Sequence, residues 1–347
     1  MFLICYGTRP EIIKLFPLIN KFKEKNISFL TLFSGQHQDL YLNYKELIPK
    51  PDYILKNIME HNQTLNKLSS KILNSIDEIL INNKNIKYII VQGDTTTAFS
   101  IALAGFHHKI KIIHLEAGLR TYNKFSPYPE ELNRSLISKI SDIHLCPTKK
   151  SINNLNIENI YDNVYLVGNT IVDSFDYIYL NFKIPDKINK IINKIKDNYF
   201  LVTLHRRENR GDKMDQMWNQ LNLLSENYNI IYITHPSIQR SNEHLTDNII
   251  KLEPQDYISM VFLIKNSSGI ITDSGGLQEE AVCARKKVLI CRDTTERPET
   301  IESGWGKLVN IKIIDNIKFL KEKDGELVNP YGENICEKII KLFVKKI

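Results

Sequence analysis

The stretch Thr272-Asp273-Ser274-Gly275-Gly276-Leu277-Gln278-Glu279-Glu280 decides the fold of this chain. It ends an apolar run, 269–272, that predicts a buried strand, and it leads into good helix formers up to Arg285. Ser274, Gly275 and Gly276 therefore fall at a strand-to-helix turn, where glycine lets a ligand approach the backbone closely. A helix start offers unpaired N–H groups and a positive dipole end, which suit a diphosphate. A plain tight turn capped by Ser274 is the alternative interpretation.

The same alternation of short apolar runs and longer amphipathic runs fills the chain, which predicts an α/β fold with parallel sheets. Strands are predicted at 2–6, 29–33, 88–91, 111–115, 143–146, 164–167, 200–204, 230–234, 249–252, 269–272 and 287–291. Helices are predicted at 11–24, 64–82, 95–107, 130–141, 213–226, 255–265, 277–284 and 331–346.

Two such runs predict two Rossmann-like, doubly wound domains. The stretch 169–198 is rich in Lys and Asn and carries Pro185, so we place the boundary there. The domains are then 1–168 and 169–330, and the last helix, within 331–347, is expected to pack back on the first. Because open parallel sheets bind ligands outside the carboxyl ends of their strands, we expect the ligand in a cleft between the domains.

Composition excludes several classes of function. The 347 residues carry a net charge of +6, and the charges are dispersed, so neither a nucleic-acid arm nor a membrane patch is indicated. The five cysteines form no C-x-x-C pair, which favours a reduced compartment and no structural metal. The amino terminus lacks the pattern of a signal peptide, and no apolar stretch approaches the ~20 residues of a membrane span. A cytoplasmic location is therefore expected.

Polar residues gather at the carboxyl ends of the predicted strands of the first half. Arg9 and Lys14, after the first strand, are candidates to meet phosphate. Asp94 is a natural helix N-cap or, alternatively, a catalytic acid. Glu116 follows a buried strand, where a carboxylate is costly unless it is paired or functional. Glu130 opens a helix, where it is also an ordinary partner of the dipole.

In the second half, His205 follows the strand 200–204 and His235 follows the strand 230–234. An Arg-rich run, 292–299, follows the strand 287–291 and includes Arg297. A single histidine is more often structural. Two histidines and several arginines at neighbouring strand ends favour a binding site.

These segments occur in the order of a known family. The chain resembles the non-hydrolysing UDP-N-acetylglucosamine 2-epimerases over nearly its whole length, through the segments 7–11, 93–97, 116–120, 129–134, 168–170 (Gly-Asn-Thr), 205–208, 273–280 and 292–299. The resemblance implies a glycosyltransferase-B-like fold, with two Rossmann-like domains facing across a substrate cleft. It also implies a homodimer.

The resemblance implies inversion of C2 in UDP-N-acetylglucosamine, which gives UDP-N-acetylmannosamine. UDP leaves C1 as the C2 proton is removed, 2-acetamidoglucal forms, and UDP adds back after C2 is protonated on its other face. This chemistry needs acid/base groups on both faces of the sugar and a firm diphosphate clamp, and it needs no cofactor or metal.

The family's roles transfer to named residues. The implied acid/base groups are Asp94, Glu116, Glu130 and His205, with the face that each serves left open. The implied substrate-binding residues are Arg9, Lys14, Arg134, His235, Leu252, Ser274, Gly275, Gly276, Glu280 and Arg297. Of these, Glu280 would accept the ribose hydroxyls, and the segment beginning at Leu252 would present backbone groups to uracil.

Two segments depart from the family pattern. Many bacterial members bind a second, activating UDP-N-acetylglucosamine through two arginines, and Gln38 and Asn62 stand at those positions here. The departure opens the question of the regulatory site and of the substituents at C3, C4 and C6 of the sugar. Two other functions remain as alternatives: a hydrolysing 2-epimerase that releases free N-acetylmannosamine and UDP, and a glycosyltransferase on the same fold.

Overall fold

The computed structural model describes residues 1–35, 44–195, 198–235, 238, 241–323 and 325–346. The chain divides into two compact units. Unit 1 comprises Met1–Ser174 and Tyr331–Ile347, and unit 2 comprises Phe175–Pro330. The boundary falls inside helix α6, Ile171–Asn181.

Unit 1 is built on one parallel sheet, which has seven strands among the described residues, in the order β3-β2-β1-β4-β5-β6-β7. Its strands are β1 Phe2–Tyr6, β2 Phe29–Phe33, β3 Tyr53–Ile54, β4 Tyr88–Gln92, β5 Lys111–Leu115, β6 Ile143–Cys146 and β7 Val164–Leu166. Its helices are α1 Arg9–Glu24, α2 Leu65–Asn82, α3 Thr96–His107, α4 Glu130–Ile140, α5 Lys149–Ile157 and α14 Ile335–Lys346.

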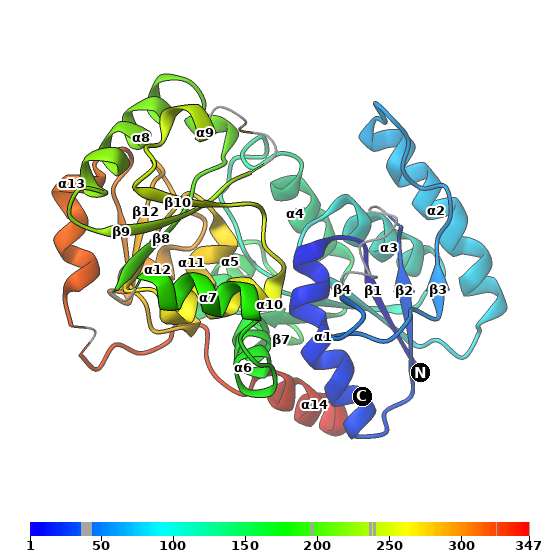
Figure 1. The fold of residues 1–347 in the computed structure, drawn as a ribbon. Coiled ribbons are helices and arrows are strands. Elements are labelled where there is room, and N and C mark those ends of the chain that lie inside the picture. The colour runs from blue at the N-terminus through cyan, green and yellow to red at the C-terminus, as the bar shows by residue number, and fades with distance from the viewer. Residues whose placement is uncertain (36–43, 196–197, 236–237, 239–240, 324, 347) are drawn as a thin grey trace. The chain divides into compact units, whose positions relative to one another are not determined.

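The helices of unit 1 cover both faces of its sheet (Figure 1). On one face, α2, α3 and α4 bury apolar side chains against alternate residues of the strands, including Leu3, Ile89 and Ile112. On the other face, α1 packs with α14, and the ring of Phe343 stacks on Phe2 at 5.3 Å between centroids. Helix α14 therefore completes the core of unit 1, most of which is formed by residues before Ser174.

Unit 2 repeats the design with a second parallel sheet, which has six strands in the described part of the chain, in the order β10-β9-β8-β11-β12-β13. Its strands are β8 Tyr199–Thr203, β9 Asn229–Ile233, β10 Ile249–Leu252, β11 Gly269–Thr272, β12 Val288–Ile290 and β13 Gly306–Leu308. Its helical segments are α7 Asp186–Ile195, η2 Arg207–Asn209, α8 Asp212–Leu224, α9 Ser241–His244, α10 Tyr257–Asn266, α11 Gly275–Cys283, α12 Pro298–Glu302, α13 Ile313–Asn316 and η3 Ile317–Lys321.

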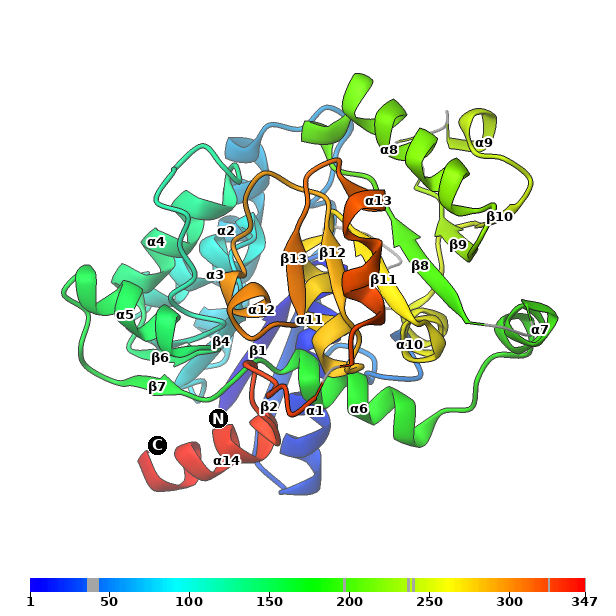
Figure 2. The same cartoon turned by 90° about the vertical axis from the view of Figure 1, so that its left-hand side faces the viewer.

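Helices α8 and α13 lie along the second sheet (Figure 2). Together with η3 they cover one of its faces, around a buried cluster that includes Trp218, Val202 and Ile271. The opposite side chains of the strands, such as Leu201 and Ile270, are fully buried as well. Strands covered on both faces read as continuous apolar runs, which is why the sequence revealed them. In both units, the order of strands is that of a Rossmann-like sheet.

The predicted strands are confirmed to within about two residues. Two short edge strands, β3 and β13, were missed, and so were several helices, including α5 and α12. The stretch 169–198, to which the sequence assigned no element, carries α6 and α7. Within the described ranges, no helix has the length and apolar character that crossing a membrane requires.

Candidate active site

In each sheet, several of the candidate residues lie where the strand order reverses. The first sheet reverses between β1 and β4, which are neighbours, and the second between β8 and β11. The loops after these strands hold Gly7–Arg9, Gly93–Asp94, His205–Arg206 and Asp273–Ser274. Ligands of doubly wound sheets bind at such reversal points. The topology therefore places two of the loops that the sequence singled out in each unit at a reversal point.

In unit 1, a buried carboxylate joins the loops after β1 and β4. Oε2 of Glu11 accepts hydrogen bonds from the backbone N–H groups of Gly7, at 2.8 Å, and Thr8, at 2.6 Å. Its Oε1 accepts one from the hydroxyl of Thr95 at 2.6 Å. Burial raises the pKa of Glu11, and these hydrogen bonds oppose that rise. Glu11 thus holds the start of α1, whose first turn contains Arg9 and Pro10.

Glu116 follows β5 in a left-handed backbone conformation, with φ +67°. Non-glycine residues seldom adopt this region, and such strain concentrates at functional sites. Lys14, which is itself buried, forms an ion pair with Oε1 of Glu116. Gln92 donates a hydrogen bond to Oε2 at 2.5 Å, and Asn169 donates one to Oε1 at 3.3 Å. The structure thus brings the predicted Lys14 and Glu116 together and adds two amides.

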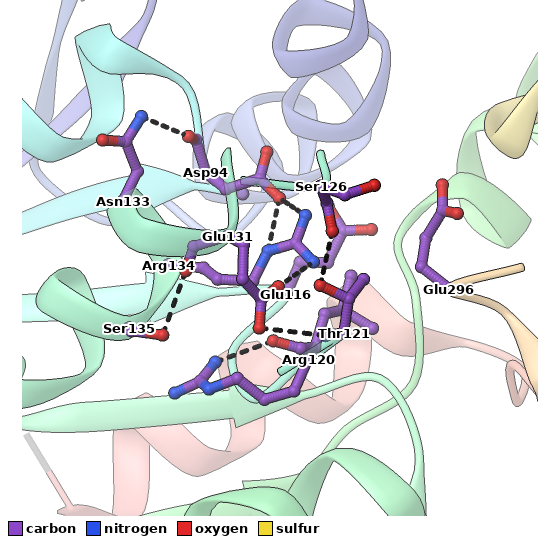
Figure 3. Close-up of polar contacts among 12 residues, drawn as sticks. Asp94, Glu116, Arg120, Thr121, Ser126, Glu131, Asn133, Arg134, Ser135 and Glu296 are labelled. Carbon is purple, nitrogen blue, oxygen red and sulfur yellow. Dashed lines mark hydrogen bonds and ion pairs between the residues drawn. The ribbon is translucent and has the colours of Figure 1, made fainter. Parts of the chain in front are cut away.

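Asp94 is not the N-cap of α3, because the adjacent Thr95 occupies that position and accepts the Ala98 N–H at 3.0 Å. Instead, the carboxylate of Asp94 receives two hydrogen bonds from Arg134, of which the one from Nε measures 2.9 Å. Figure 3 shows the guanidinium group of Arg134 between Asp94 and Glu131, which it meets at 3.0 Å. The capping interpretation is therefore wrong, and Asp94 belongs to a buried charge network.

Glu130 is the first residue of α4. Its Oε2 atom is buried and has no hydrogen-bond partner among the residues that the structure describes. A buried, unsatisfied carboxyl oxygen is unusual in native proteins and costs free energy. An atom of this kind is a candidate to contact substrate.

In unit 2, α11 follows β11 as expected, but it begins at Gly275, two residues before the predicted start at 277. Ser274 is its N-cap residue, but the Ser274 side chain makes no capping hydrogen bond, so the alternative of a Ser-capped turn is wrong. A Cβ atom at Gly276 would meet none of the described residues' atoms within 4 Å, whereas one at Gly275 would lie 2.5 Å from Nη1 of Arg297. Glu280 lies in the second turn of the helix, half-buried.

Asp273, at the end of β11, organises the loop after β8. Its fully buried carboxylate accepts the backbone N–H groups of His205, at 3.0 Å, and Arg206, at 2.9 Å. The side chain of Asn209 donates to the same carboxylate at 2.9 Å. The His205 ring stacks on His235 with 4.9 Å between ring centroids. Burial lowers the pKa of His205, and the charge of Asp273 acts in the opposite direction.

The Arg-rich run folds back over the start of α11. Glu296 accepts hydrogen bonds from Arg292, at 2.7 Å, and Arg297, at 2.6 Å. Burial alone would raise the pKa of Glu296, but the guanidinium groups of Arg297, Arg292 and Arg206 hold it well below its usual range. Nε of Arg297 also donates to Glu279, in α11, at 2.8 Å. The predicted residues Arg297 and Gly275 therefore lie side by side.

The carbonyl oxygen of Leu252 already accepts two hydrogen bonds from Thr234, from the backbone N–H at 2.8 Å and from the hydroxyl at 3.1 Å. Gln38, in the first of the two departures from the family pattern, lies outside the described residues. Asn62, in the second, is exposed with φ +55°.

Sequence reasoning assigned no role to Glu11, Gln92, Asn169 or Asp273, which hold the candidate residues in place. Each of these four residues is a polar residue at the end of a buried strand or inside one of the quoted motifs, which was the available indication. The sequence did not indicate their hydrogen-bond partners, most of which lie far away along the chain.

Comparison with known proteins identifies the family. The family described as UDP-N-acetylglucosamine 2-epimerase matches residues 20–343. A UDP-N-acetylglucosamine 2-epimerase of Campylobacter jejuni is 41% identical, over 99% of this chain and 97% of that protein. The family's fold is glycosyltransferase-B-like, as predicted, and its members are isomerases.

Solved structures agree. The UDP-GlcNAc 2-epimerase of Neisseria meningitidis bound to UDP-GlcNAc matches with a TM-score of 0.89 and 36% identity, over 99% of this chain and 100% of that one. The Methanocaldococcus jannaschii enzyme in complex with UDP-GlcNAc and UDP matches with a TM-score of 0.84 and 34% identity, with the same coverage. This chain belongs to the UDP-N-acetylglucosamine 2-epimerase family.

Proposed function

We propose that the chain is a non-hydrolysing epimerase that interconverts UDP-N-acetylglucosamine and UDP-N-acetylmannosamine, or a close UDP-hexosamine analogue. The observation that carries the proposal is a set of three carboxyl groups in unit 1: Asp94 and Glu116, which follow β4 and β5, and Glu130, which begins α4. Asp94 and Glu116 are held by buried cations, and Glu130 has a buried oxygen with no partner in the described part of the chain. Transfer of a sugar to an acceptor would not need these three together.

The proposed reaction begins with elimination. A carboxylate removes the proton at C2, the C1–O bond to the diphosphate breaks, and a C1=C2 double bond forms. The electron pair of the broken bond leaves with UDP. A second group then protonates C2 on its opposite face, and the diphosphate oxygen bonds to C1 again. Atoms and charge balance with no oxidant, reductant or water consumed, and the products differ from the substrate only at C2.

For the nucleotide, we propose that unit 2 supplies the diphosphate site. The start of α11 offers N–H groups beside Gly275 and Gly276, and Ser274 keeps its hydroxyl out of a capping bond. A dipole and free N–H groups at a helix start favour an anion. Glu280 is proposed for the ribose, and His205, whose backbone Asp273 holds, for proton transfer. In unit 1, Arg9 at the start of α1 is proposed as a further phosphate contact.

The non-hydrolysing reaction is favoured over the hydrolysing one by the Arg-rich run. The segment Arg292–Glu299 is complete and packs over the start of α11 through Arg297 and Glu296. A residue that clamps the leaving diphosphate keeps UDP available for its return to C1, whereas hydrolysis requires that UDP be lost.

The test is incubation with UDP-N-acetylglucosamine in D2O, followed by NMR. The proposal expects UDP-linked manno epimer that carries deuterium at C2, with no free sugar. Free N-acetylmannosamine and UDP would establish the hydrolysing reaction instead. Turnover that depends on an added acceptor would indicate a glycosyltransferase, and no turnover would overturn the proposal.

A further inference from the structure

The motif Gly168-Asn169-Thr170 follows β7 and leads into α6, and the proposed reaction assigns it no role. Gly168 has φ +100°, and a Cβ atom there would lie 2.5 Å from the carbonyl oxygen of Tyr331. That same carbonyl oxygen accepts the backbone N–H of Asn169 at 2.9 Å. The segment that returns to unit 1 at Tyr331 therefore lies directly on Gly168, and only glycine fits so close an approach. This contact between Tyr331 and Gly168–Asn169 fixes the backbone from which the Asn169 side chain extends.

The side-chain amide of Asn169 has one defined orientation. Its Oδ1 accepts the backbone N–H of Ile171, the first residue of α6, at 3.1 Å. Because that position demands an acceptor, the amide nitrogen must point the other way. Nδ2 then donates to Oε1 of Glu116 at 3.3 Å. Asn169 is buried, with 3% of its surface exposed, so water does not compete strongly for either contact.

Glu116 needs such positioning more than an ordinary carboxylate. Its own backbone is left-handed, so its conformation persists only if the surroundings impose it. Lys14 supplies a charge at Oε1, but an ammonium group has rotatable donors and little directionality. The planar amides of Asn169 and Gln92 approach the two carboxylate oxygens separately and define the plane of the group.

We propose that Asn169 is a positioning residue for Glu116, and that the returning segment at Tyr331 is part of the device that aims it. The inference rests on the proposed function of Glu116 in proton transfer. It adds that the end of the chain acts on the chemistry through Asn169, without contacting the sugar.

Three substitutions separate this role from the capping of α6. Asn169→Asp keeps the acceptor for the Ile171 N–H but turns the donor toward Glu116 into a second negative charge. Asn169→Ser keeps a cap of the helix start and loses the reach to Glu116. Asn169→Ala loses both contacts. Hydrogen bonds to charged groups contribute enough that we expect kcat to fall by about 10- to 100-fold in all three, most in Asn169→Asp.

The Michaelis constant for UDP-N-acetylglucosamine and the affinity for UDP should stay within about twofold of wild type, because neither contact involves the ligand. Asn83→Asp is the matched control. Asn83 is half-buried, donates to the Ile79 carbonyl at 2.8 Å and accepts from the Tyr53 hydroxyl at 3.1 Å, so this change should leave kcat intact.

If Asn169 only caps α6, the three variants should behave differently. Asn169→Asp and Asn169→Ser would then keep the wild-type kcat, and only Asn169→Ala would lose thermal stability; that result overturns the inference. Should Asn169→Asp fail to fold, Asn169→Ser decides alone. The proposed function is judged separately, because wild-type enzyme that yields no C2-deuterated epimer refutes it whatever the variants do.

Discussion

The carboxylate of Asp273 accepts the backbone N–H of His205 at 3.0 Å and so ties the end of β11 to the end of β8. The same residue directly precedes the turn that we assign to the diphosphate. One buried charge thus fixes both the histidine loop and the start of α11. Three other charged groups also act on the pKa of His205: His235 and Arg206 lower it, and Glu208 raises it.

Substitution of Asp273 should change the titration of His205. Burial lowers the pKa of His205 and Asp273 raises it, so Asp273→Asn should lower that pKa further. The amide keeps one oxygen as acceptor for the loop. NMR titration of the histidine ring signals, with the His205 signal assigned through His205→Asn, measures the change. An unchanged or higher pKa would show that Asp273 does not act on the ring.

The carboxyl groups of unit 1 should be necessary for turnover. Glu116→Gln and Glu130→Gln keep side-chain shape and remove the exchangeable charge, so each should reduce kcat by ~10²-fold or more. Steady-state kinetics should show little change in the Michaelis constant. The exposed Glu60, which pairs with Lys71, provides the control Glu60→Gln, with wild-type turnover expected. Near wild-type rates in both active-site variants would refute the assignment.

The two glycines of α11 should separate folding from ligand binding. A Cβ at Gly276 has open space among the residues that the structure describes, so Gly276→Ala should leave the melting temperature unchanged. If a diphosphate lies against the helix start, the same methyl group should weaken UDP binding by calorimetry, by about tenfold or more. Gly275→Val should abolish UDP binding and also disturb Arg297 and Glu296, which lie within 2.7 Å of its Cβ position. Unaltered UDP affinity in both variants would remove the diphosphate from this turn.

Two buried histidines should make the protein labile to acid. Burial lowers the pKa of His114 to about 3 and that of His144 to about 4, from the ordinary value of 6.5. Below pH 6.5 both histidines become protonated in the unfolded chain, whereas in the native state they stay neutral until the pH approaches their lowered pKa values. The stabilisation is therefore complete above pH 6.5 and is lost as the pH falls toward 4.

For His144 alone, the loss between about pH 7 and about pH 5 should be roughly 2 kcal/mol. Urea unfolding at the two pH values should show a smaller decrease in His144→Gln than in wild type. His61→Gln, at an exposed position, should keep the wild-type decrease. Equal decreases in all three proteins would refute this origin of acid lability.

Regulation by a second nucleotide sugar should be absent. Arginine binds a diphosphate bidentately, and Gln38 and Asn62 stand at the two positions where the family resemblance implied arginines. The reverse reaction from UDP-N-acetylmannosamine alone should then proceed without added UDP-N-acetylglucosamine, and the dependence of rate on substrate should be hyperbolic. A strict requirement for the added gluco epimer would show that other cations, such as Arg207 or Arg210, replace the lost charges.

The buried strands could be predicted because both faces of each sheet are covered, so strands such as β1 and β12 are apolar throughout. Edge strands β3 and β13 have two and three residues, too few to show a pattern. Asp94 was a plausible N-cap by type, but Thr95 is equally suited, and the choice was made by Arg134, forty positions away in sequence. Contacts across such separations, like those of Asp273 with His205, leave no local signature.

The return of the chain to unit 1 at Tyr331 also bears on the order of events during synthesis. A nascent chain exposes its residues from the amino terminus onward, and domains generally fold as units when their residues are complete. Unit 2 has all of its residues before Tyr331 emerges, whereas unit 1 still lacks α14 and the carbonyl that sets Asn169. The unit that is translated first is thus the last to be finished, and a ribosome-bound chain halted before Tyr331 should hold a folded unit 2 and an unfinished unit 1.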